Sequence, residues 1–361
     1  MYLDKDGITA MKPELEKLCE DFIANRDVVK KTFRWDNASC YPVCANVLCA
    51  YGITADPDRL KECRDVVKKH TRPFSKFRGQ VKPILSCMLA HGEDPDARMD
   101  LANDYYRLLK RKFRKSEYLV LAAFLAADLA DRSLTEETAA RGKEIFRLMN
   151  RNHRILTNKT DSVSAVLMAF SGKTDNELID DMEACYKVLK TRFSGSAAQP
   201  AAQVLSMVSG TPEEKAQRVI EFYDALQEAG VNYGRSAEIA PLAALSVSGI
   251  PVSALVEEIK DADAFLEEKQ ESKKDEEKKD RALQAAMIVS DQYANTEYVN
   301  TTVMTGALDI MIAKKRSVLA SIAWQLVQFL FEVLAGISKS DDKTEKVPEG
   351  SNESAEQSGK E

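Results

Sequence analysis

The sequence carries none of the short motifs by which most enzyme classes are recognised. It contains no GxSxG, HExxH, P-loop or GxGxxG pattern, and only three histidines. Paired carboxylates such as Glu117 with Asp128 occur, but a helical protein with 57 acidic residues always contains some. The sequence therefore predicts no catalytic residue and no cofactor, and an uncharacterised enzyme stays only as an alternative.

Cysteine pairing signals are also missing. The seven cysteines are odd in number, include no CxxC pair and follow no signal peptide, so we expect free thiols in the cytoplasm. Cys40, Cys44 and Cys49 lie close enough together to raise the question of zinc. Buried structural cysteines explain them better, because free cysteine packs as a small hydrophobic residue. No metal ligands are predicted.

No excess of one charge marks the whole chain, whose formal net charge is -6. One stretch is locally basic: residues 61–115 hold 15 Lys and Arg against 7 Asp and Glu. Its cations gather at the ends of two predicted helices, where the helix dipole favours them. Stacked side by side, these ends would form a basic ridge that could meet phosphates. The candidate basic surface comprises Lys68, Lys69, Arg72, Lys76, Arg78, Arg107, Lys110, Arg111, Lys112, Arg114 and Lys115.

What the sequence does contain is a repeat of about 40 residues. Five glycines follow short apolar runs at spacings of 40, 80, 38 and 39 residues: Gly52, Gly92, Gly172, Gly210 and Gly249. Prolines precede four of them by eight to ten residues: Pro42, Pro83, Pro200 and Pro241. Proline suits the first turn of a helix and glycine the left-handed residue after its end. Each run therefore predicts a short helix.

A longer helix is predicted after each glycine. Asp56, Asp94 and Thr211 each supply an N-cap oxygen followed by proline, and the pairs Thr174 with Glu177 and Thr211 with Glu214 read as capping boxes. Aromatic and aliphatic pairs three residues apart recur near the ends of these helices, as in Tyr106 with Leu109, Phe146 with Met149, Tyr186 with Leu189 and Tyr223 with Leu226. Together these markers predict an all-α protein of tandem helical hairpins, either an α-solenoid or a closed α/α-toroid-like array. The short helices, rich in small residues, should form the inner layer.

The hairpins divide the chain into four parts. Residues 1–37 are an N-terminal extension and capping helix, with Met1 and Met11 as alternative translation starts, and residues 38–302 hold the repeats. The units are 38–75, 76–114, 115–156, 157–195, 196–234, 235–268 and a partial 282–302. The charged run 267–281 between the last two units is expected to be solvated. Residues 303–338 are predicted to form C-terminal capping helices, and the polar residues 339–361 a disordered tail.

One segment needs a membrane test. Residues 317–337 are 21 residues long and follow three cations, as a membrane anchor would. Gln325, Gln328 and Glu332, however, form one polar stripe, which favours an amphipathic helix that closes the end of the stack. The sequence predicts a capping helix, with an anchor as the alternative.

The chain resembles the bacterial domain-of-unknown-function family numbered four thousand and three. The matching stretches are FRW at 33–35, FSKFRG at 74–79, SEYL at 116–119 with the apolar run after it, DSV at 161–163 and MEACYKVLK at 182–190. The resemblance runs from about residue 12 to beyond 300 and implies a cytosolic bacterial protein without an assigned activity. Helical arrays mostly present binding surfaces. We therefore expect a non-catalytic binding or scaffold protein with protein partners, with nucleic-acid or anion binding through the basic ridge as the alternative.

Overall fold

The computed structural model describes residues 11–36, 38, 40–128, 134–236, 238–270 and 275–294. Within these ranges the chain forms fourteen α-helices, two short 3-10 helices and no strand. The prediction of an all-α protein is confirmed. Among the helices described, none is long and apolar enough to cross a lipid bilayer. The segments predicted at 303–338 and 339–361, including the anchor candidate 317–337, lie outside the described residues.

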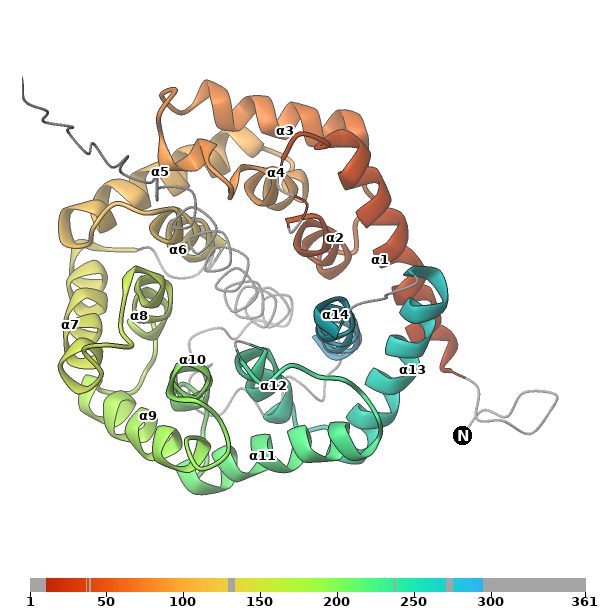
Figure 1. The fold of residues 1–361 in the computed structure, drawn as a ribbon. Coiled ribbons are helices and arrows are strands. Elements are labelled where there is room, and N and C mark those ends of the chain that lie inside the picture. The colour runs from red at the N-terminus through yellow and green to blue at the C-terminus, as the bar shows by residue number, and fades with distance from the viewer. Residues whose placement is uncertain are drawn as a thin grey trace, which may run out of the picture.

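The helices form a closed ring of two concentric layers (Figure 1). The longer, charged helices form the outer layer: α1 (Pro13–Thr32), α3 (Pro57–Lys69), α5 (Pro95–Lys112), α7 (Glu136–Asn152), α9 (Asp175–Leu189), α11 (Pro212–Glu228) and α13 (Val252–Gln270). The inner layer comprises α2 (Cys40–Ala50), α4 (Lys82–Ala90), α6 (Glu117–Asp128), α8 (Ser162–Met168), α10 (Gly195–Ser206), α12 (Ile239–Ser246) and α14 (Asp275–Ala294). The 3-10 helices η1 (Lys76–Arg78) and η2 (Lys159–Asp161) precede α4 and α8.

Edge-on and tilted contacts between aromatic rings join successive units of the outer layer. Phe113, at the end of α5, packs edge-on against Phe146 of α7 with ring centroids 5.8 Å apart, and Phe193 meets Tyr223 of α11 in the same way at 5.2 Å. His153 lies against Tyr186 of α9 at 4.3 Å. The aromatic residues that mark the repeat in the sequence are thus the ones that join one outer helix to the next.

The ring closes where its first and last helices meet. α1 packs on α13 and α14, and α2 packs on α14. Polar contacts reinforce this seam: Lys12 forms an ion pair with Glu258 of α13, and the hydroxyl of Tyr293 donates to the Glu258 carboxylate at 2.5 and 2.6 Å. Glu258 is buried. The seam therefore combines apolar packing with a buried charge that residues from both ends of the described chain satisfy.

Most predicted helix starts are found at the expected residues. Pro57, Pro95 and Pro212 begin their helices, and Thr174 with Glu177 forms the predicted capping box. Thr211 does not cap: its hydroxyl donates to the Glu214 side chain at 2.7 Å, and its side chain accepts no backbone hydrogen.

Other predictions in the repeat were wrong in detail. Pro200 lies inside α10 rather than in its first turn, because Ser194 caps that helix six residues earlier, accepting from the Ala197 amide at 3.3 Å. Gly52, Gly210 and Gly249 have positive φ, but Gly92 and Gly172 do not, so the turns after α4 and α8 close without a left-handed glycine.

The charged run 267–281 was expected to be a solvated helix tip or loop, and Glu267, Glu268, Lys269 and Asp280 are exposed. α13 extends to Gln270 and α14 begins at Asp275, so most of the run is helical. Arg281 is buried, and its guanidinium donates to Asp263 at 2.8 and 3.0 Å and to Glu267 at 2.9 Å. The charges pair between two adjacent helices, which a composition-based reading does not reveal.

The aromatic residues after α1 do not act together. Phe33 is 1% exposed and belongs to the core, whereas Trp35 is 86% exposed and contacts only the Arg34 guanidinium among the described ring contacts, at 4.8 Å. Of the two rings, only Phe33 therefore takes part in packing the end of α1 against the core.

Candidate binding surface at the centre of the ring

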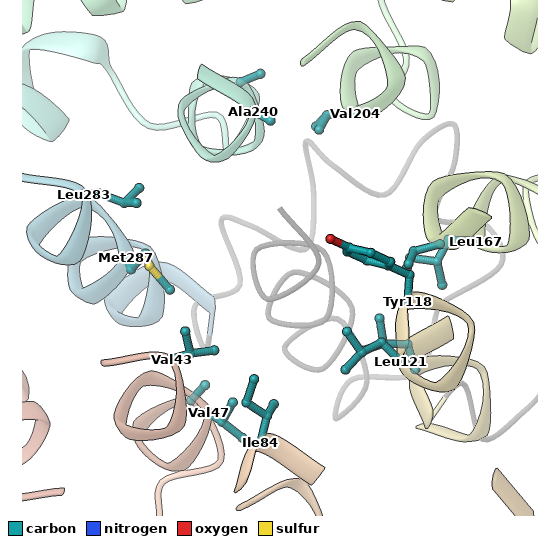
Figure 2. Packing of buried hydrophobic residues seen from close by; sticks show 14 of the residues in the cluster. Val43, Val47, Ile84, Tyr118, Leu121, Leu167, Val204, Ala240, Leu283 and Met287 are labelled. Carbon is teal, nitrogen blue, oxygen red and sulfur yellow. The ribbon is translucent and has the colours of Figure 1, made fainter. Parts of the chain in front are cut away.

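All seven inner helices point apolar side chains toward the middle of the ring (Figure 2). We call the residues labelled there the central wall: Val43, Val47, Ile84, Tyr118, Leu121, Leu167, Val204, Ala240, Leu283 and Met287. Val43 with Val47 and Leu283 with Met287 are four residues apart, and Tyr118 with Leu121 three apart. These spacings place both members of a pair on one face of a helix. The central wall therefore follows from the helical period of the inner elements.

The central wall is almost inaccessible to water. Its least buried member, Leu167, is 7% exposed, and Val43, Val47 and Ile84 are fully buried. The inner helices can bury both their faces because they carry few charges: all seven residues of α8 are buried, for example. An inner helix is thus apolar toward the outer layer and also toward the ring axis, whereas an outer helix is apolar on one face only.

A polar pair lies among these apolar side chains, where α2 meets α14. The Asn46 side-chain amide donates to Oδ2 of Asp291 at 2.9 Å, and Asp291 follows Met287 of the central wall by four residues. Oδ1 of each residue has no hydrogen-bond partner. Burial raises the pKa of Asp291 well above its usual range, because the carboxyl loses its solvation. The pair therefore leaves two buried oxygens, one on each residue, that could each accept a hydrogen bond.

A second set of polar contacts joins α10 to η2 and to the loop before η2. Gln203 donates to Asp161 at 2.7 Å, and Gln199 donates to Thr157 at 3.1 Å. Burial raises the pKa of Asp161, while hydrogen bonds from Asn158 and Gln203 oppose the shift. Oε1 of Gln203 remains without a partner. Both polar spots therefore hold a carboxyl against an amide, a combination that orients neighbouring helices.

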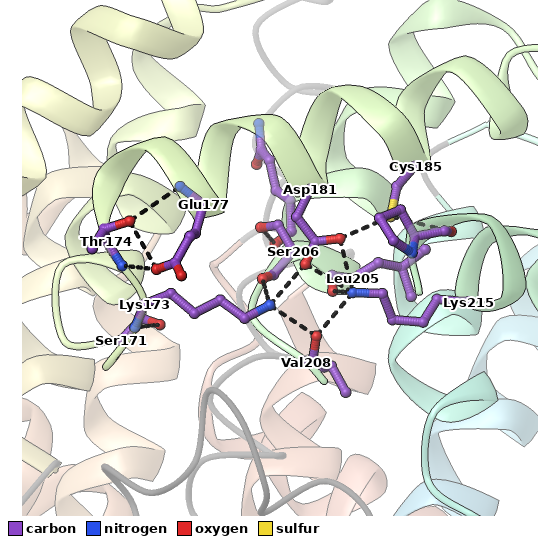
Figure 3. A network of polar contacts seen from close by, with 12 residues as sticks. Ser171, Lys173, Thr174, Glu177, Asp181, Cys185, Leu205, Ser206, Val208 and Lys215 are labelled. Atoms are coloured by element: carbon purple, nitrogen blue, oxygen red, sulfur yellow. Dashed lines mark hydrogen bonds and ion pairs between the residues drawn. The ribbon is translucent and has the colours of Figure 1, made fainter. Parts of the chain in front are cut away.

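A charged cluster closes the C-terminal end of α10 (Figure 3). Lys215 is buried and donates to both oxygens of Asp181, at 2.9 and 3.0 Å, and to the carbonyls of Leu205 and Val208 at 2.8 Å. Lys173 reaches Asp181 at 2.7 Å and the Val208 carbonyl at 3.0 Å. The lysines satisfy carbonyls that a helix end leaves open. We assign this cluster a structural role.

Arginines from outer helices do the same at other inner helix ends. Arg141 of α7 donates to the carbonyls of Ala169 and Ser171 after α8, at 3.0 and 2.8 Å, and to Asp175 at 2.8 Å. Arg218 of α11 donates to the Ile250 carbonyl at 2.8 Å. These cations hold the two layers together and are already engaged, so they add nothing to a ligand site.

The predicted basic surface is spread over the outer layer, and many of its cations have partners within the chain. Lys68 pairs with Asp65 at 2.7 Å, and Lys69 with Asp96 at 2.6 Å. Arg78 donates to the Lys68 and Thr71 carbonyls at the end of α3 and so has partners within the chain.

In α5 and the loop after it, Arg107 pairs with Asp104 at 2.5 Å, Arg111 with Glu136 at 3.9 Å, and the Lys110 ammonium lies 6.0 Å from the Tyr106 ring centroid. Arg72, Lys76, Lys112, Arg114 and Lys115 are exposed. Carboxylates are therefore interleaved with the cations, and the basic ridge stays a prediction.

The cysteines pack in the core. Six are buried and Cys49 is partly buried. Burial raises the pKa of Cys19, Cys49 and Cys185 to about 12 in each case, so these thiols stay protonated at neutral pH. No group of three or more His, Cys, Asp or Glu side chains that could hold a metal ion is found within the described ranges.

Sequence reasoning found the inner helices but missed the central wall. Its residues are ordinary aliphatic side chains, and only their three- and four-residue spacing within each short helix could have indicated a second apolar face. Asn46, Asp291, Asp181 and Lys215 were also missed, because each pairs with a residue from another helix.

Comparison with known proteins returns one match. Residues 25–317 match the family described as "Protein of unknown function (DUF4003)". No curated protein and no solved structure matches the chain significantly.

Proposed function

The chain belongs to the DUF4003 family of proteins of unknown function, and on that premise we propose that it is a non-catalytic binding protein whose central wall holds an apolar, helix-shaped segment. The observation that carries the proposal is the second apolar face of the inner layer. A helical array needs one buried face per helix to fold, and here every inner helix has two. Large contiguous apolar surfaces beyond the needs of folding mark binding sites.

We further propose that the ring is an α/α toroid of tandem hairpins with the boundaries 38–75, 76–114, 115–156, 157–195, 196–234 and 235–268. Each unit contributes one inner and one outer helix, and α14 supplies the partial unit that completes the inner layer. The recurring ring pairs between neighbouring outer helices support this division. Seven free cysteines support a reducing compartment, and we place the protein in the cytoplasm.

The chemistry of the central wall specifies what it would bind. Nine of its ten residues are aliphatic or methionine, and the tenth, Tyr118, adds one hydroxyl. Such a surface recognises shape and apolar area rather than charge, and its gain is about 25 cal/mol for each Å² removed from water. A ring of seven helices surrounds an elongated object on all sides. An amphipathic helix with a broad apolar face therefore fits the surface better than an extended peptide, which would bring unpaired backbone groups.

A labelled synthetic helix of leucine, alanine and glutamine, about 20 residues long, tests the proposal. Fluorescence anisotropy should show saturable binding of this peptide to the full chain. Leu121→Gln and Val204→Thr, which make the central wall more polar at little change in volume, should weaken binding by about 10-fold or more each, or ~1.4 kcal/mol.

The matched control is Ile155→Thr. Ile155 is 96% exposed on the outside of the ring, so this substitution should leave peptide binding unchanged. Binding that responds equally to Ile155→Thr and to the central-wall variants would contradict the proposal, as would no binding at all.

A further inference from the structure

The central wall requires a cover. The outer layer covers the opposite side of each inner helix, and inner helices pack side by side at α2–α4, α6–α8, α10–α12, α12–α14 and α14–α2. Neither covers the side that points to the ring axis, yet the side chains there are at most 7% exposed, Leu167 being the least buried. An apolar surface contributed by seven helices would be costly to leave in water. Something apolar must therefore lie against it.

The same chain has a suitable segment within reach. The described part of the chain ends at Ala294 in α14, an inner helix whose Leu283 and Met287 are members of the central wall. Residues 295–316 then separate α14 from the apolar segment 317–337. An extended chain spans up to about 3.5 Å per residue, so a connection of this length reaches any point of the ring.

The composition of residues 317–337 suits a site surrounded on all sides. Glu332 is the only charged residue in the segment, and the polar stripe of Gln325, Gln328 and Glu332 occupies a narrow part of the helical circumference. A helix lying across the end of a stack needs one apolar face, whereas this pattern is apolar around most of its circumference. As a helix the segment would be about 32 Å long.

We propose that residues 317–337 of the same chain dock against the central wall and are the resting occupant of this binding surface. The inference rests on the function proposed above and names the first ligand of that same surface. The amide donors of Gln325 and Gln328 also have acceptors to meet, because Oδ1 of Asn46 and Oδ1 of Asp291 lack partners at the α2–α14 junction. An outside partner must then displace the chain's own segment.

The chain offers its own spectroscopic probe. It contains two tryptophans, Trp35, which is 86% exposed, and Trp324, which lies in the segment. Trp35→Phe leaves Trp324 as the only reporter in the full chain. We expect its emission to be blue-shifted and poorly quenched by acrylamide, and we expect Leu121→Gln or Val204→Thr in the same background to increase the quenching.

Two controls keep this result unambiguous. Trp324→Phe leaves Trp35 alone, whose emission should be red-shifted, readily quenched and insensitive to changes in the central wall. Circular dichroism checks that each variant is folded, and hydrogen exchange of the unmodified chain should show protected amides in 317–337 without any substitution.

Three outcomes would overturn the inference. The first is a Trp324 that acrylamide quenches as readily as Trp35. The second is burial of Trp324 only after neutral phosphatidylcholine vesicles are added, which would assign the segment to a membrane. The third is burial that is lost on dilution together with a dimer in light scattering, which would assign the segment to a second copy.

The same peptide separates this inference from the proposed function. The double substitution Leu326→Gln with Leu330→Gln should weaken the docking of residues 317–337 against the central wall. The labelled helix should then bind this variant more tightly, by about 10-fold or more. In the unmodified chain it competes with a tethered segment whose effective concentration is near millimolar. If the peptide binds to the central wall but Trp324 is exposed, the proposed function holds and the inference fails. If Trp324 is buried against the central wall but the peptide does not bind even this variant, the inference holds and the proposed function fails.

Discussion

The inner and outer layers of the ring are both built of α-helices, but the helices of the two layers differ in length and in charge. The outer helices are long and carry their charges on the solvent side, where several pair with a carboxylate three residues away, as Arg147 does with Glu144 at 2.6 Å. The inner helices other than α14 are mostly shorter and almost uncharged between their ends, whereas α14 carries its charges mainly in its first seven residues. Their stability depends on packing rather than on helix propensity, because isolated helices of two or three turns are marginal in water.

This difference shows where a function can reside. An outer helix has one apolar face, and that face packs against the inner layer. An inner helix is buried on both sides: in α4 the axis-facing Ile84 and its neighbour Leu85 are both fully buried. The second face is not needed to hold the two layers together. It is therefore the part of the fold available to a ligand, and substitutions in the two layers should separate stability from binding.

The largest expected effect comes from removing a core ring in the inner layer. Phe124 of α6 is fully buried and packs near Phe77, with ring centroids 6.2 Å apart. Phe124→Ala should lower the free energy of unfolding by about 3–5 kcal/mol, because it removes apolar burial and leaves a cavity. Urea unfolding followed by circular dichroism measures the change. Phe74→Ala is the control: Phe74 is fully exposed on the outside, so a change of about 0.5 kcal/mol or less is expected.

The next effect tests the contact between the layers. Gly142 of α7 lies so close to α8 that a Cβ there would approach the Ala165 carbonyl oxygen at 3.2 Å and the Val166 Cα at 3.3 Å. Gly142→Leu should therefore destabilise the fold by about 1–3 kcal/mol through overpacking. Gly172→Leu places the same side chain where nothing lies within 4 Å and should be nearly neutral. Equal urea midpoints for the two variants would contradict the close approach of α7 and α8.

Gly142 also shows how far sequence reasoning extends. The period was found from glycines at helix ends, and Gly52, Gly210 and Gly249 have the positive φ that this logic requires. Gly142 lies inside a helix and has no such signature, because its role is set by the distance to another helix. Local rules for caps, turns and periodicity therefore located the helices and their order, and contacts between helices lay beyond them.

The candidate site follows the same division. The spacing of Val43 and Val47 follows from helical geometry, so an apolar second face could have been read from the sequence. That the seven faces converge on one axis could not, because it depends on the closure of the ring between α1, α13 and α14. The pairing of Asn46 with Asp291, 245 positions apart, depends on that closure as well.

A smaller effect distinguishes two predicted caps of the outer layer. Asp94 accepts a hydrogen bond from the Ala97 amide at 2.9 Å, whereas Thr211 makes no such bond to the backbone. Asp94→Ala should cost about 1 kcal/mol of unfolding free energy, since it leaves an amide at the helix start without its partner. Thr211→Ala should cost clearly less. Equal losses in urea unfolding would show that the hydroxyl of Thr211 caps its helix in solution.

The smallest effect is expected on the basic ridge of the outer layer. Arg111 and Glu136 are both more than 60% exposed, and their charged groups are 3.9 Å apart. Arg111→Ala should change the free energy of unfolding by about 0.5 kcal/mol or less, because water screens such pairs. The ridge should also bind polyanions weakly, because Asp65, Asp96 and Asp104 lie among its cations.

Heparin chromatography of the full chain measures this directly. Elution at low salt, unchanged in a Lys112→Ala and Lys115→Ala double variant, is the result expected of a solvated helix edge matched to the helix dipole. Retention that persists at high salt and falls in this variant would instead make the ridge a phosphate-binding surface, since releasing counterions from several phosphate contacts produces such a salt dependence. The outer layer would then carry a binding function of its own, and the separation of stability and binding between the two layers would no longer hold.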